Sequence, residues 1–277
     1  MCFAFVFICF KFRALGMDES LFVRLSNITP TAIVPLQLQY RMCGPVNSLA
    51  NKLTYGGDLK CGDESVEQAT LHLPLADKML PELSHRPWLL SVIKPDLVHS
   101  VSFLDTNLLA TRFHRSLTDE GTKAPVNPCE AALTLLVAAA LNKNGLSYNH
   151  IGIIAPYQSQ VQYLRNLSKQ HLDLEINTVD QYQGRDKDAI LYTCTKSELT
   201  GTFQDQGNQT ILHDLRRLTV AVTRAKHKLV IVGDSVTLKQ YPPFVKLLNA
   251  LEQHQWVSLC FGKDGLDPQQ TEPQPLL

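Results

Sequence analysis

The sequence predicts an α/β domain built on a parallel sheet with helices on its faces. From residue 34 to residue 233, short apolar runs alternate with segments of helical period, and this alternation is typical of strands joined by crossover helices. The chain has 277 residues and a hydrophobic fraction of 44%, which is enough for a substantial core. Prolines near helix starts and a glycine past a helix end support the same fold class.

Six apolar runs are the predicted strands. They cover residues 34–41, 101–106, 151–156, 174–179, 189–195 and 228–233. The segment NPCEAALTLLVAAALNKNG, residues 127–145, has a proline near its start, a glutamate in its first turn and a glycine just past its end, so it is predicted to be a helix. A second helix is predicted over residues 157–171, where Val161, Leu164 and Leu167 lie on one stripe.

A third helix is predicted ahead of the last strand. Its apolar stripe is formed by Ile211, Leu215, Leu218, Val222 and Ala225. Arg217 and Arg224 are predicted to share another stripe of the same helix. The basic residues around it have two interpretations, a solvated basic face beside a core helix or a cluster that binds phosphate.

Composition restricts the class of protein. Twenty-six basic and 26 acidic residues give a formal net charge of zero, so the chain as a whole has no electrostatic signature of a nucleic-acid binder and any such site must be local. The seven cysteines never form the C-x-x-C spacing of a zinc site or a redox pair, so we expect no metal site and a reduced, intracellular protein.

The sequence divides into one predicted domain, residues 13–260, and three atypical segments. Residues 1–12 are strongly apolar yet too short to span a bilayer, and we interpret them as non-family sequence at a truncated start, with a degraded signal sequence as the alternative. Residues 58–100 are dotted with prolines and weakly periodic, so an irregular insertion is expected there. The tail 261–277, rich in Gly, Pro and Gln, is expected to be disordered.

Three polar motifs interrupt the apolar runs. They are QYRM at residues 39–42, NTVDQYQGRDKDAI at 177–190 and RRLTVAVTRAKHKLVIVG at 216–233. In open parallel sheets, sites form in the loops beyond the carboxyl ends of the strands, so we expect the functional residues at that edge. Each motif alone has a plain structural interpretation, such as a polar turn in which Gly184 adopts a positive φ. Their joint occurrence favours a functional interpretation.

These motifs resemble the C-terminal motifs of superfamily one DNA and RNA helicases, in the same order and at plausible separations. Together with ALGMDESLF, NKLTYGGDLKCG, IGIIAPY and YPPFVKLLNAL, they make residues 13–257 similar to the eukaryotic DNA replication helicase/nucleases. The resemblance implies a RecA-like, P-loop NTPase-type fold, of which this chain would form the second lobe only. In such motors ATP lies between two lobes, and the first lobe supplies the phosphate loop and the metal-binding acids.

The resemblance also implies roles for individual residues. Tyr40 would stack on the base of ATP, Arg41 would reach the terminal phosphate, and Arg224 would be the arginine finger that stabilises charge during phosphoryl transfer. The other implied ATP-binding residues are Gln183, Gly184, Asp186 and Arg217, and the implied DNA-binding residues are Ala155, Pro156, Tyr157, Thr178 and Val179. Asp186 stands where many relatives have glutamate, so its carboxylate reaches one methylene less far. A structural alternative stays open for the loop at residues 156–157, with the proline starting a helix and the tyrosine packing on it.

Several parts of a complete motor do not occur in the sequence. No G-x-x-x-x-G-K-[ST] phosphate loop is present, and the acid pairs Asp18–Glu19, Asp63–Glu64 and Asp119–Glu120 do not follow apolar strands. No E-x-K run of a nuclease and no counterpart of the family's iron–sulfur cysteines occurs either. We therefore expect ATP and Mg²⁺ to be bound by a complete two-lobed enzyme and not tightly by this chain alone.

The leading hypothesis is the C-terminal motor lobe of an ATP-dependent helicase/nuclease that moves from the five-prime to the three-prime end of single-stranded DNA and acts on flap intermediates in replication and repair. By resemblance, its partners would be single-stranded DNA, the first helicase lobe, a nuclease domain, and single-strand-binding and replication or repair proteins. The expected location is the nucleus, with mitochondria as an open addition and no membrane association. Two alternatives remain: a non-catalytic module that binds DNA or a partner, and a lobe of a superfamily one RNA helicase.

Overall fold

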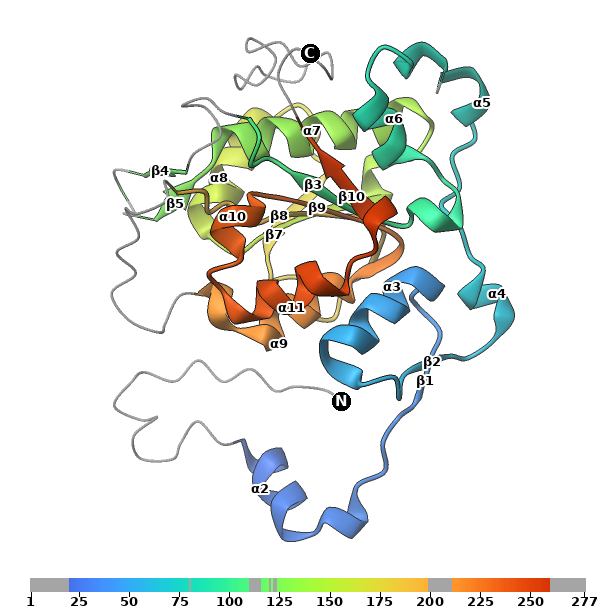
Figure 1. Ribbon diagram of the computed structural model, residues 1–277, viewed down its shortest axis with the longest axis vertical. Helices are drawn as coiled ribbons and strands as arrows, with labels where there is room; N and C mark the ends of the chain where they lie inside the picture. Colours follow the sequence, from blue (N-terminus) through green and yellow to red (C-terminus); the bar gives the residue numbers. More distant parts are fainter. Residues whose placement is uncertain are drawn as a thin grey trace.

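The computed structural model describes residues 20–79, 81–109, 116–119, 121, 124–198 and 211–259. Its central element is a six-stranded sheet in the order β10-β3-β9-β8-β6-β7, in which every neighbouring pair is parallel (Figure 1). The strands are β3 (Val101–Asp105), β6 (Ile151–Ala155), β7 (Glu175–Thr178), β8 (Lys187–Thr193), β9 (Ala225–Gly233) and β10 (Trp256–Ser258). The predicted fold class, α/β with a parallel sheet flanked by helices, is confirmed.

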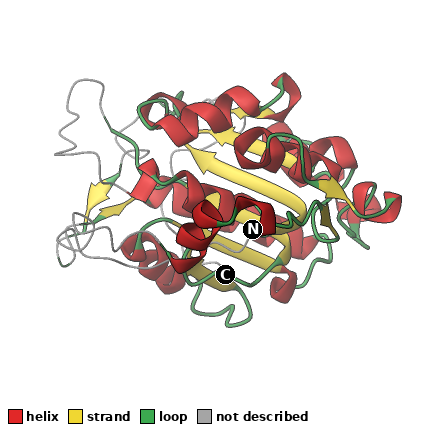
Figure 2. Cartoon of the chain, turned by 90° about the horizontal axis from the view of Figure 1, so that it is seen from below, coloured by secondary structure: helices red, strands yellow, loops and turns green. Residues whose placement is uncertain are grey.

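Helices cover both faces of this sheet (Figure 2). One layer consists of α6 (Pro87–Ile93), α7 (Pro128–Lys143) and α8 (Gln158–Leu167), and the other of α3 (Gly44–Ala50), α9 (Leu215–Val222) and α11 (Pro242–Ala250). Successive residues of a strand point to opposite faces, so Leu229 and Ile231 pack with the second layer while Val230 and Val232 pack with the first. Burial on both faces explains why these strands appear in the sequence as continuous apolar runs.

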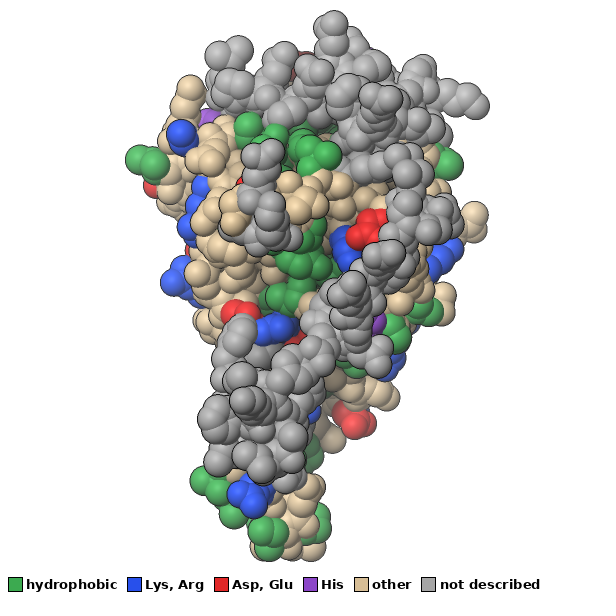
Figure 3. All heavy atoms as spheres, turned by 90° about the vertical axis from the view of Figure 1, so that its left-hand side faces the viewer, with side chains coloured by type: hydrophobic (Ala, Val, Ile, Leu, Met, Phe, Trp, Pro, Cys, Tyr) green, Lys and Arg blue, Asp and Glu red, His purple; other side chains and the backbone are tan. Residues whose placement is uncertain are grey.

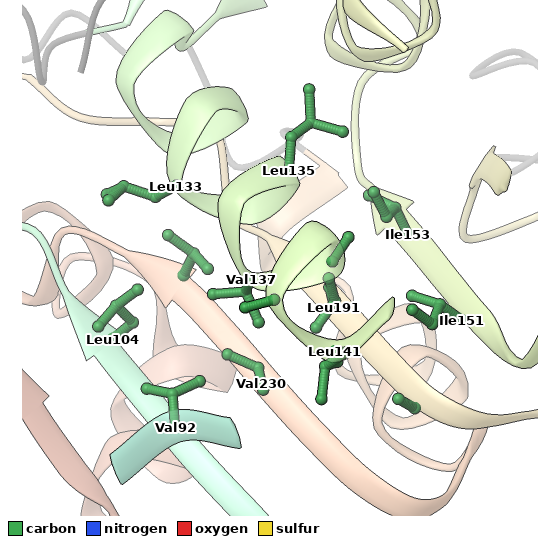
Figure 4. Close-up of a cluster of buried hydrophobic side chains, with 14 of the residues drawn as sticks. Val92, Leu104, Leu133, Leu135, Val137, Leu141, Ile151, Ile153, Leu191 and Val230 are labelled. Carbon is green, nitrogen blue, oxygen red and sulfur yellow. The ribbon is translucent and has the colours of Figure 1, made fainter. Parts of the chain in front are cut away.

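The helix α7 makes the main apolar contact of the first layer (Figure 4). The side chains that meet there are Leu133, Val137 and Leu141 of α7 and Ile153, Leu191 and Val230 of the sheet. All of them are almost fully buried, and burial of one such side chain stabilises the fold by roughly 1.5–3 kcal/mol. Packing of this helix therefore fixes the position of the loops at both of its ends.

The boundaries of α7 follow the signals in its sequence. The side chain of Asn127 accepts a hydrogen bond from the N–H of Glu130 at 3.0 Å, and Pro128 occupies the first turn. The helix ends at Lys143, and Gly145 adopts a φ of 99°, a conformation that favours glycine. The helix predicted over residues 127–145 is confirmed. The helix predicted over residues 157–171 is confirmed as α8, which ends four residues earlier than predicted, at Leu167.

Shorter elements connect the layers. The short helices are α2 (Leu21–Ile28), α4 (Glu64–Glu67), α5 (Ala76–Met79) and α10 (Ser235–Leu238). Single turns of 3-10 helix lie at Pro30–Ala32, Pro81–Leu83, Leu97–His99, Tyr148–His150, Ile211–His213 and Gln253–Gln255, and a π turn lies at Asn51–Tyr55. Two small sheets complete the set: a parallel pair of β1 (Leu38–Gln39) and β2 (Lys60–Cys61), and an antiparallel pair of β4 (Leu117–Thr118) and β5 (Pro125–Val126). In Figure 1, α2 lies apart from the sheet, and none of its residues is buried. No helix in the part of the chain that the structure describes has the length and apolar character needed to cross a membrane.

The strand predicted over residues 34–41 is wrong as a member of the central sheet. Only Leu38–Gln39 forms a strand, and it pairs with β2 outside the six-stranded sheet. Val34 and Leu36 are 83% and 81% exposed. An apolar run predicts a buried strand only when a core lies on both sides of it, and the sequence does not show where the core is.

The helix predicted before the last strand is shorter than expected. Ile211 belongs to a separate 3-10 turn, the helix α9 covers only Leu215–Val222, and Ala225 already begins β9. Arg224 therefore lies outside the helix, and the stripe that it was predicted to share with Arg217 does not form. The strand β10 was not predicted, because three residues, of which two are partly buried and one is exposed, give no periodic signal.

The segment 58–100 is less irregular than its composition indicates. In its described part, residues 58–79 and 81–100, no strand joins the central sheet, but α6 buries Trp88, Leu89, Val92 and Ile93 in the core. The fully buried Lys228 of β9 holds this segment, because its Nζ donates to the carbonyl oxygens of Val92 at 2.8 Å and His99 at 2.7 Å. Burial lowers the pKa of Lys228 to about 7. The segments 1–12 and 261–277 lie outside the described residues.

Candidate functional site

Charged side chains from distant parts of the chain meet at the amino ends of β8 and β9. Asp186 directly precedes β8, Arg224 directly precedes β9, and Lys226 is the second residue of β9. Arg41 reaches them from the turn after β1. We call Arg41, Asp186, Arg224 and Lys226 the amino-edge cluster. We expected the functional residues beyond the carboxyl ends of the strands, and this expectation is wrong for the amino-edge cluster. Asp186 and Arg224 lie in the loops that lead into β8 and β9, and such loops lie at the amino edge of a sheet.

Asp186 is the centre of the amino-edge cluster. One of its carboxylate oxygens accepts a hydrogen bond from Nε of Arg41 at 3.0 Å, and the other lies 3.0 Å from Nζ of Lys226. Burial raises the pKa of Asp186, but the hydrogen bonds and positive charges of Lys226 and Arg41 outweigh it, so the pKa lies below its usual value. Both Arg41 and Lys226 side chains are 37% exposed, so ligands in solvent can reach them.

Arg224 donates mainly to main-chain oxygens. Its Nε donates to the carbonyl of Val220 at 3.0 Å and its Nη1 to the carbonyl of Arg185 at 3.2 Å, while Nη2 donates to Oγ1 of Thr223 at 3.2 Å. Arg41 likewise donates from Nη1 to the carbonyl of Thr223 at 3.4 Å. Both guanidinium groups thus contact Thr223, Arg41 through its carbonyl oxygen and Arg224 through its hydroxyl oxygen.

Arg217 lies at the other end of α9 and has a different partner. Its Nε and Nη2 donate to the two carboxylate oxygens of Asp180 at 3.0 and 3.2 Å, a bidentate pair. Asp214 caps the helix by accepting from the N–H groups of Arg216 and Arg217. Arg217 and Arg224 are therefore not brought together, and Arg217 connects α9 to the loop after β7.

Tyr40 projects from the turn that Gln39 organises. The side-chain oxygen of Gln39 accepts from the N–H groups of Arg41 at 2.8 Å and Met42 at 2.7 Å, and its Nε2 donates to the carbonyl of Met42 at 2.8 Å. Tyr40 is 66% exposed. The turn therefore presents an open aromatic ring directly beside Arg41.

Gln183 and Gly184 lie on the exposed loop between β7 and β8. Gly184 adopts a φ of 83°, and a Cβ built on it would meet no atom within 4 Å. The positive φ predicted for Gly184 is confirmed, so glycine is favoured there by its backbone conformation and not by crowding. Tyr182 of the same loop is buried against Gly152, with its hydroxyl 2.1 Å from where a Cβ of Gly152 would lie.

The residues implied in DNA binding lie at the carboxyl edge of the sheet. Ala155 ends β6 and Thr178 ends β7, and the two are register partners. Ala155, Pro156 and Val179 are buried, whereas Tyr157 and Thr178 are partly exposed. The helix α8 begins directly after Tyr157, so the N–H groups of its first turn lie at this edge. The structure brings the five residues together on two adjacent strand ends.

Sequence reasoning missed a second cluster at the carboxyl edge, which we call the carboxyl-edge network. It consists of Asn127, Glu130, Gln160, Thr193 and Thr195. The carboxylate of the fully buried Glu130 accepts from Oγ1 of Thr193 and from the N–H of Thr195, each at 2.7 Å. Burial raises the pKa of Glu130 to about 8, although these two hydrogen bonds oppose the rise. Thr195 is held at a φ of 71°, which is unfavourable for a β-branched residue.

Other partners of the predicted residues were also missed. Lys226, Gln39 and Asp180 have no assigned role in the sequence interpretation, although all three lie inside the motifs that carry it. Their positions in the motifs are a signal, but their contacts depend on residues far away in the chain.

The amino-edge cluster contains three cationic side chains and one carboxylate, from Arg41, Arg224, Lys226 and Asp186. Within the residues that the structure describes, no group of three or more His, Cys, Asp or Glu side chains could hold a metal ion. On the face shown in Figure 3, basic and acidic side chains lie next to one another, which agrees with the net charge of zero. The arginines at the amino edge present planar forks that match phosphate oxygens.

A parallel α/β domain with arginines at one edge of its sheet is a class of domain suited to binding phosphate groups. The chain belongs to the AAA_12 family of AAA domains, whose family model matches residues 17–236.

The chain is also similar to helicase/nucleases. It is 40% identical over 253 residues to the human DNA replication ATP-dependent helicase/nuclease DNA2, covering 88% of this chain and 22% of that protein. It is 38% identical over 245 residues to the Arabidopsis thaliana DNA replication ATP-dependent helicase/nuclease JHS1, covering 88% of this chain and 17% of that protein. A solved structure of the C-terminal domain of a possible DNA helicase from Lactobacillus matches with a TM-score of 0.32 and 10% identity, over 65% of this chain and 95% of that one. The resemblance to the helicase/nucleases is confirmed, and the chain spans about a fifth of the length of these relatives.

Proposed function

We propose that this domain is the second motor lobe of an ATP-dependent DNA helicase/nuclease. The amino-edge cluster is the observation that carries the proposal, because it gathers residues from three separate motifs: Arg41 and Lys226 contact the carboxylate of Asp186, and Arg224 donates to the carbonyl of the preceding residue, Arg185. ATP and Mg²⁺ would be bound mainly by another lobe, and this lobe would contribute its cations. Single-stranded DNA in replication and repair intermediates is the proposed substrate, and the nucleus the proposed location.

The present partners of the arginines are ones that a triphosphate can replace. Arg224 donates to two neutral carbonyl oxygens, and hydrogen bonds to a charged phosphate are roughly twice as strong as neutral ones. Asp186 holds Arg41 with one oxygen and Lys226 with the other, so Arg41 can turn toward a phosphate while the carboxylate keeps Lys226. We assign Arg224 as the arginine finger and Arg41 as the residue that reaches the terminal phosphate.

The remaining implied residues have supporting roles in this proposal. Tyr40 would stack on the base, and the loop with Gln183, Gly184 and Asp186 would close over the ribose and phosphates. Arg217 would act through its pair with Asp180, which ties α9 to that loop. The carboxyl edge, with Tyr157, Thr178 and the start of α8, would hold the DNA backbone.

ATP hydrolysis by a complete enzyme that contains this lobe tests the proposal. Arg224→Ala is expected to lower kcat by about 10³-fold or more, because an arginine finger contributes that much to phosphoryl transfer. Arg216→Ala is the matched control, since Arg216 is exposed on α9 and outside the amino-edge cluster, and it should leave kcat unchanged. An unchanged kcat in Arg224→Ala would overturn the assignment. DNA-stimulated hydrolysis of ATP by this chain alone would overturn the proposal that another lobe binds most of the ATP and Mg²⁺.

A further inference from the structure

The ring of Tyr40 lies on a glycine that belongs to a different segment of the chain. A Cβ built on Gly62 would lie 2.1 Å from Cε1, 2.3 Å from Cζ and 2.6 Å from Cδ1 of Tyr40. These three distances belong to adjacent ring atoms, so the ring covers the position of the missing side chain. Since real Cβ atoms essentially never approach another atom within 3.0 Å, no side chain at residue 62 is compatible with this position of the ring.

The short β1–β2 pair fixes this contact from both sides. The N–H of Lys60 donates to the carbonyl of Gln37 at 2.7 Å, and the N–H of Gly62 donates to the carbonyl of Gln39 at 2.8 Å. The side chain of Gln39 then holds the turn that follows, through Arg41 and Met42. The backbone on both sides of the contact is hydrogen-bonded, so the ring itself must move if the space beneath it is filled.

The backbone of Gly62 does not itself require glycine. The glycines of the described residues with a positive φ are Gly56, Gly57, Gly145 and Gly184. Gly62 is outside this set, so alanine can adopt its conformation without strain. An effect of Gly62→Ala therefore reports the loss of space under the ring and not a distorted backbone.

We propose that Gly62 is a positioning residue for the purine base of the bound nucleotide. It supports one face of the Tyr40 ring and leaves the other face, on a side chain that is 66% exposed, open for the base to stack. This inference rests on the proposed function, in which Tyr40 stacks on ATP. In this proposal, the strands β1 and β2, which take no part in the central sheet, hold the Tyr40 ring, the platform on which the base stacks, beside Arg41.

The position of the ring is tested by NMR on this chain. Protons over the face of an aromatic ring are shifted upfield, so an α-proton of Gly62 is expected to show an upfield ring-current shift. Tyr40→Leu should abolish the shift, whereas Tyr40→Phe should retain it. An α-proton of Gly62 at its ordinary position, unaffected by Tyr40→Leu, would overturn the contact on which the proposal stands.

The functional consequence is tested by steady-state kinetics on a complete enzyme that contains this lobe. Gly62→Ala is expected to raise KM for ATP about tenfold and to leave kcat unchanged, because a base stacked on an aromatic ring contributes about that factor in affinity. Gly121→Ala is the matched control, since among the described residues its Cβ would meet only a side-chain oxygen, at 3.7 Å. Hydrolysis of tripolyphosphate, which has no base, should be unaffected by Gly62→Ala.

A double variant separates failure of this inference from failure of the proposed function. If Gly62 acts through Tyr40, Gly62→Ala combined with Tyr40→Leu should be no worse than Tyr40→Leu alone. A raised KM in Tyr40→Leu with a normal KM in Gly62→Ala would overturn the role of Gly62 and leave the base platform intact. An unchanged KM in Tyr40→Leu would overturn the platform itself, and the role of Gly62 with it.

Discussion

The two edges of the central sheet hold polar residues in opposite ways. At the amino edge, Arg41 and Asp186 are 37% and 31% exposed and form an ion pair that water can reach. At the carboxyl edge, Glu130 is fully buried and is hydrogen-bonded to Thr193 and Thr195. Both edges thus use a carboxylate as a centre, but only one of them leaves its partners accessible.

This difference separates residues that can change partners from residues that fix the backbone. A partly exposed ion pair contributes little to stability. Arg41 can therefore leave Asp186 and bind a phosphate with little loss of folding free energy. A buried carboxylate whose donors have no alternative partner is expensive to disturb. We therefore expect substitutions in the amino-edge cluster to change catalysis and substitutions in the carboxyl-edge network to change folding.

The largest expected effect is the pH dependence that Glu130 imposes on stability. Its pKa is about 8 in the folded chain, against 4.5 for an unperturbed glutamate. The folded state therefore keeps a proton that the unfolded state loses, so stability is complete below about pH 4.5 and falls as the pH rises to about 8, by up to about 4 kcal/mol. Urea denaturation of this chain across that range measures the loss. Glu130→Gln, which does not titrate, should flatten the curve, and an equally steep curve in that variant would contradict the assignment.

Removal of the Glu130 carboxyl group should also have a large effect. At pH 5, Glu130→Ala is expected to lower the free energy of unfolding by about 3 kcal/mol, because the hydroxyl of Thr193 and the N–H of Thr195 lose a buried acceptor. The matched change at the other edge, Asp186→Ala, should cost less than about 1 kcal/mol. Equal losses in the two variants, measured by urea denaturation, would remove the distinction between the edges.

Lys228 should produce a pH dependence of the opposite sign in a higher window. Its pKa is about 7 in the folded chain and 10.5 when unperturbed, so the unfolded state binds the proton that the folded state releases. The contribution of Lys228 is lost as the pH falls from about 10.5 to about 7, and stability should rise with pH across that range by up to about 4 kcal/mol. Lys228→Met should remove this rise in thermal or urea unfolding. A rise that persists in the variant would have to come from another group.

The smallest expected effect is the coupling between Arg41 and Asp186. A double-mutant cycle with Arg41→Ala and Asp186→Ala should give a coupling energy below about 1 kcal/mol in the free energy of unfolding of this chain. A coupling energy of several kcal/mol would mean that the ion pair is needed for folding, and would contradict the proposal that Arg41 leaves Asp186 to bind a phosphate.

The sequence predicted the parallel sheet and the helices α7 and α8 because burial on both faces and clear capping residues leave a signal in neighbouring positions. It failed for residues 34–41, since exposure of Val34 and Leu36 depends on where the core lies. The motifs that contain Arg41, Asp186 and Arg224 lie near one another in the fold, but at the amino edge of the sheet and not at the carboxyl edge where we expected them. The carboxyl-edge network and the contact of Gly62 with Tyr40 left no local signal, because their partners are separated along the chain.

The most direct test of the account is ATPase activity as a function of single-stranded DNA concentration, measured on a complete enzyme carrying Arg224→Lys. Lysine keeps the charge but not the planar fork of donors. If the amino edge acts on ATP and the carboxyl edge on DNA, the maximal rate should fall by about 10³-fold, while the DNA concentration that gives half-maximal stimulation stays unchanged. A maximal rate close to that of the unsubstituted enzyme, or a loss seen only as weaker stimulation by DNA, would contradict the account.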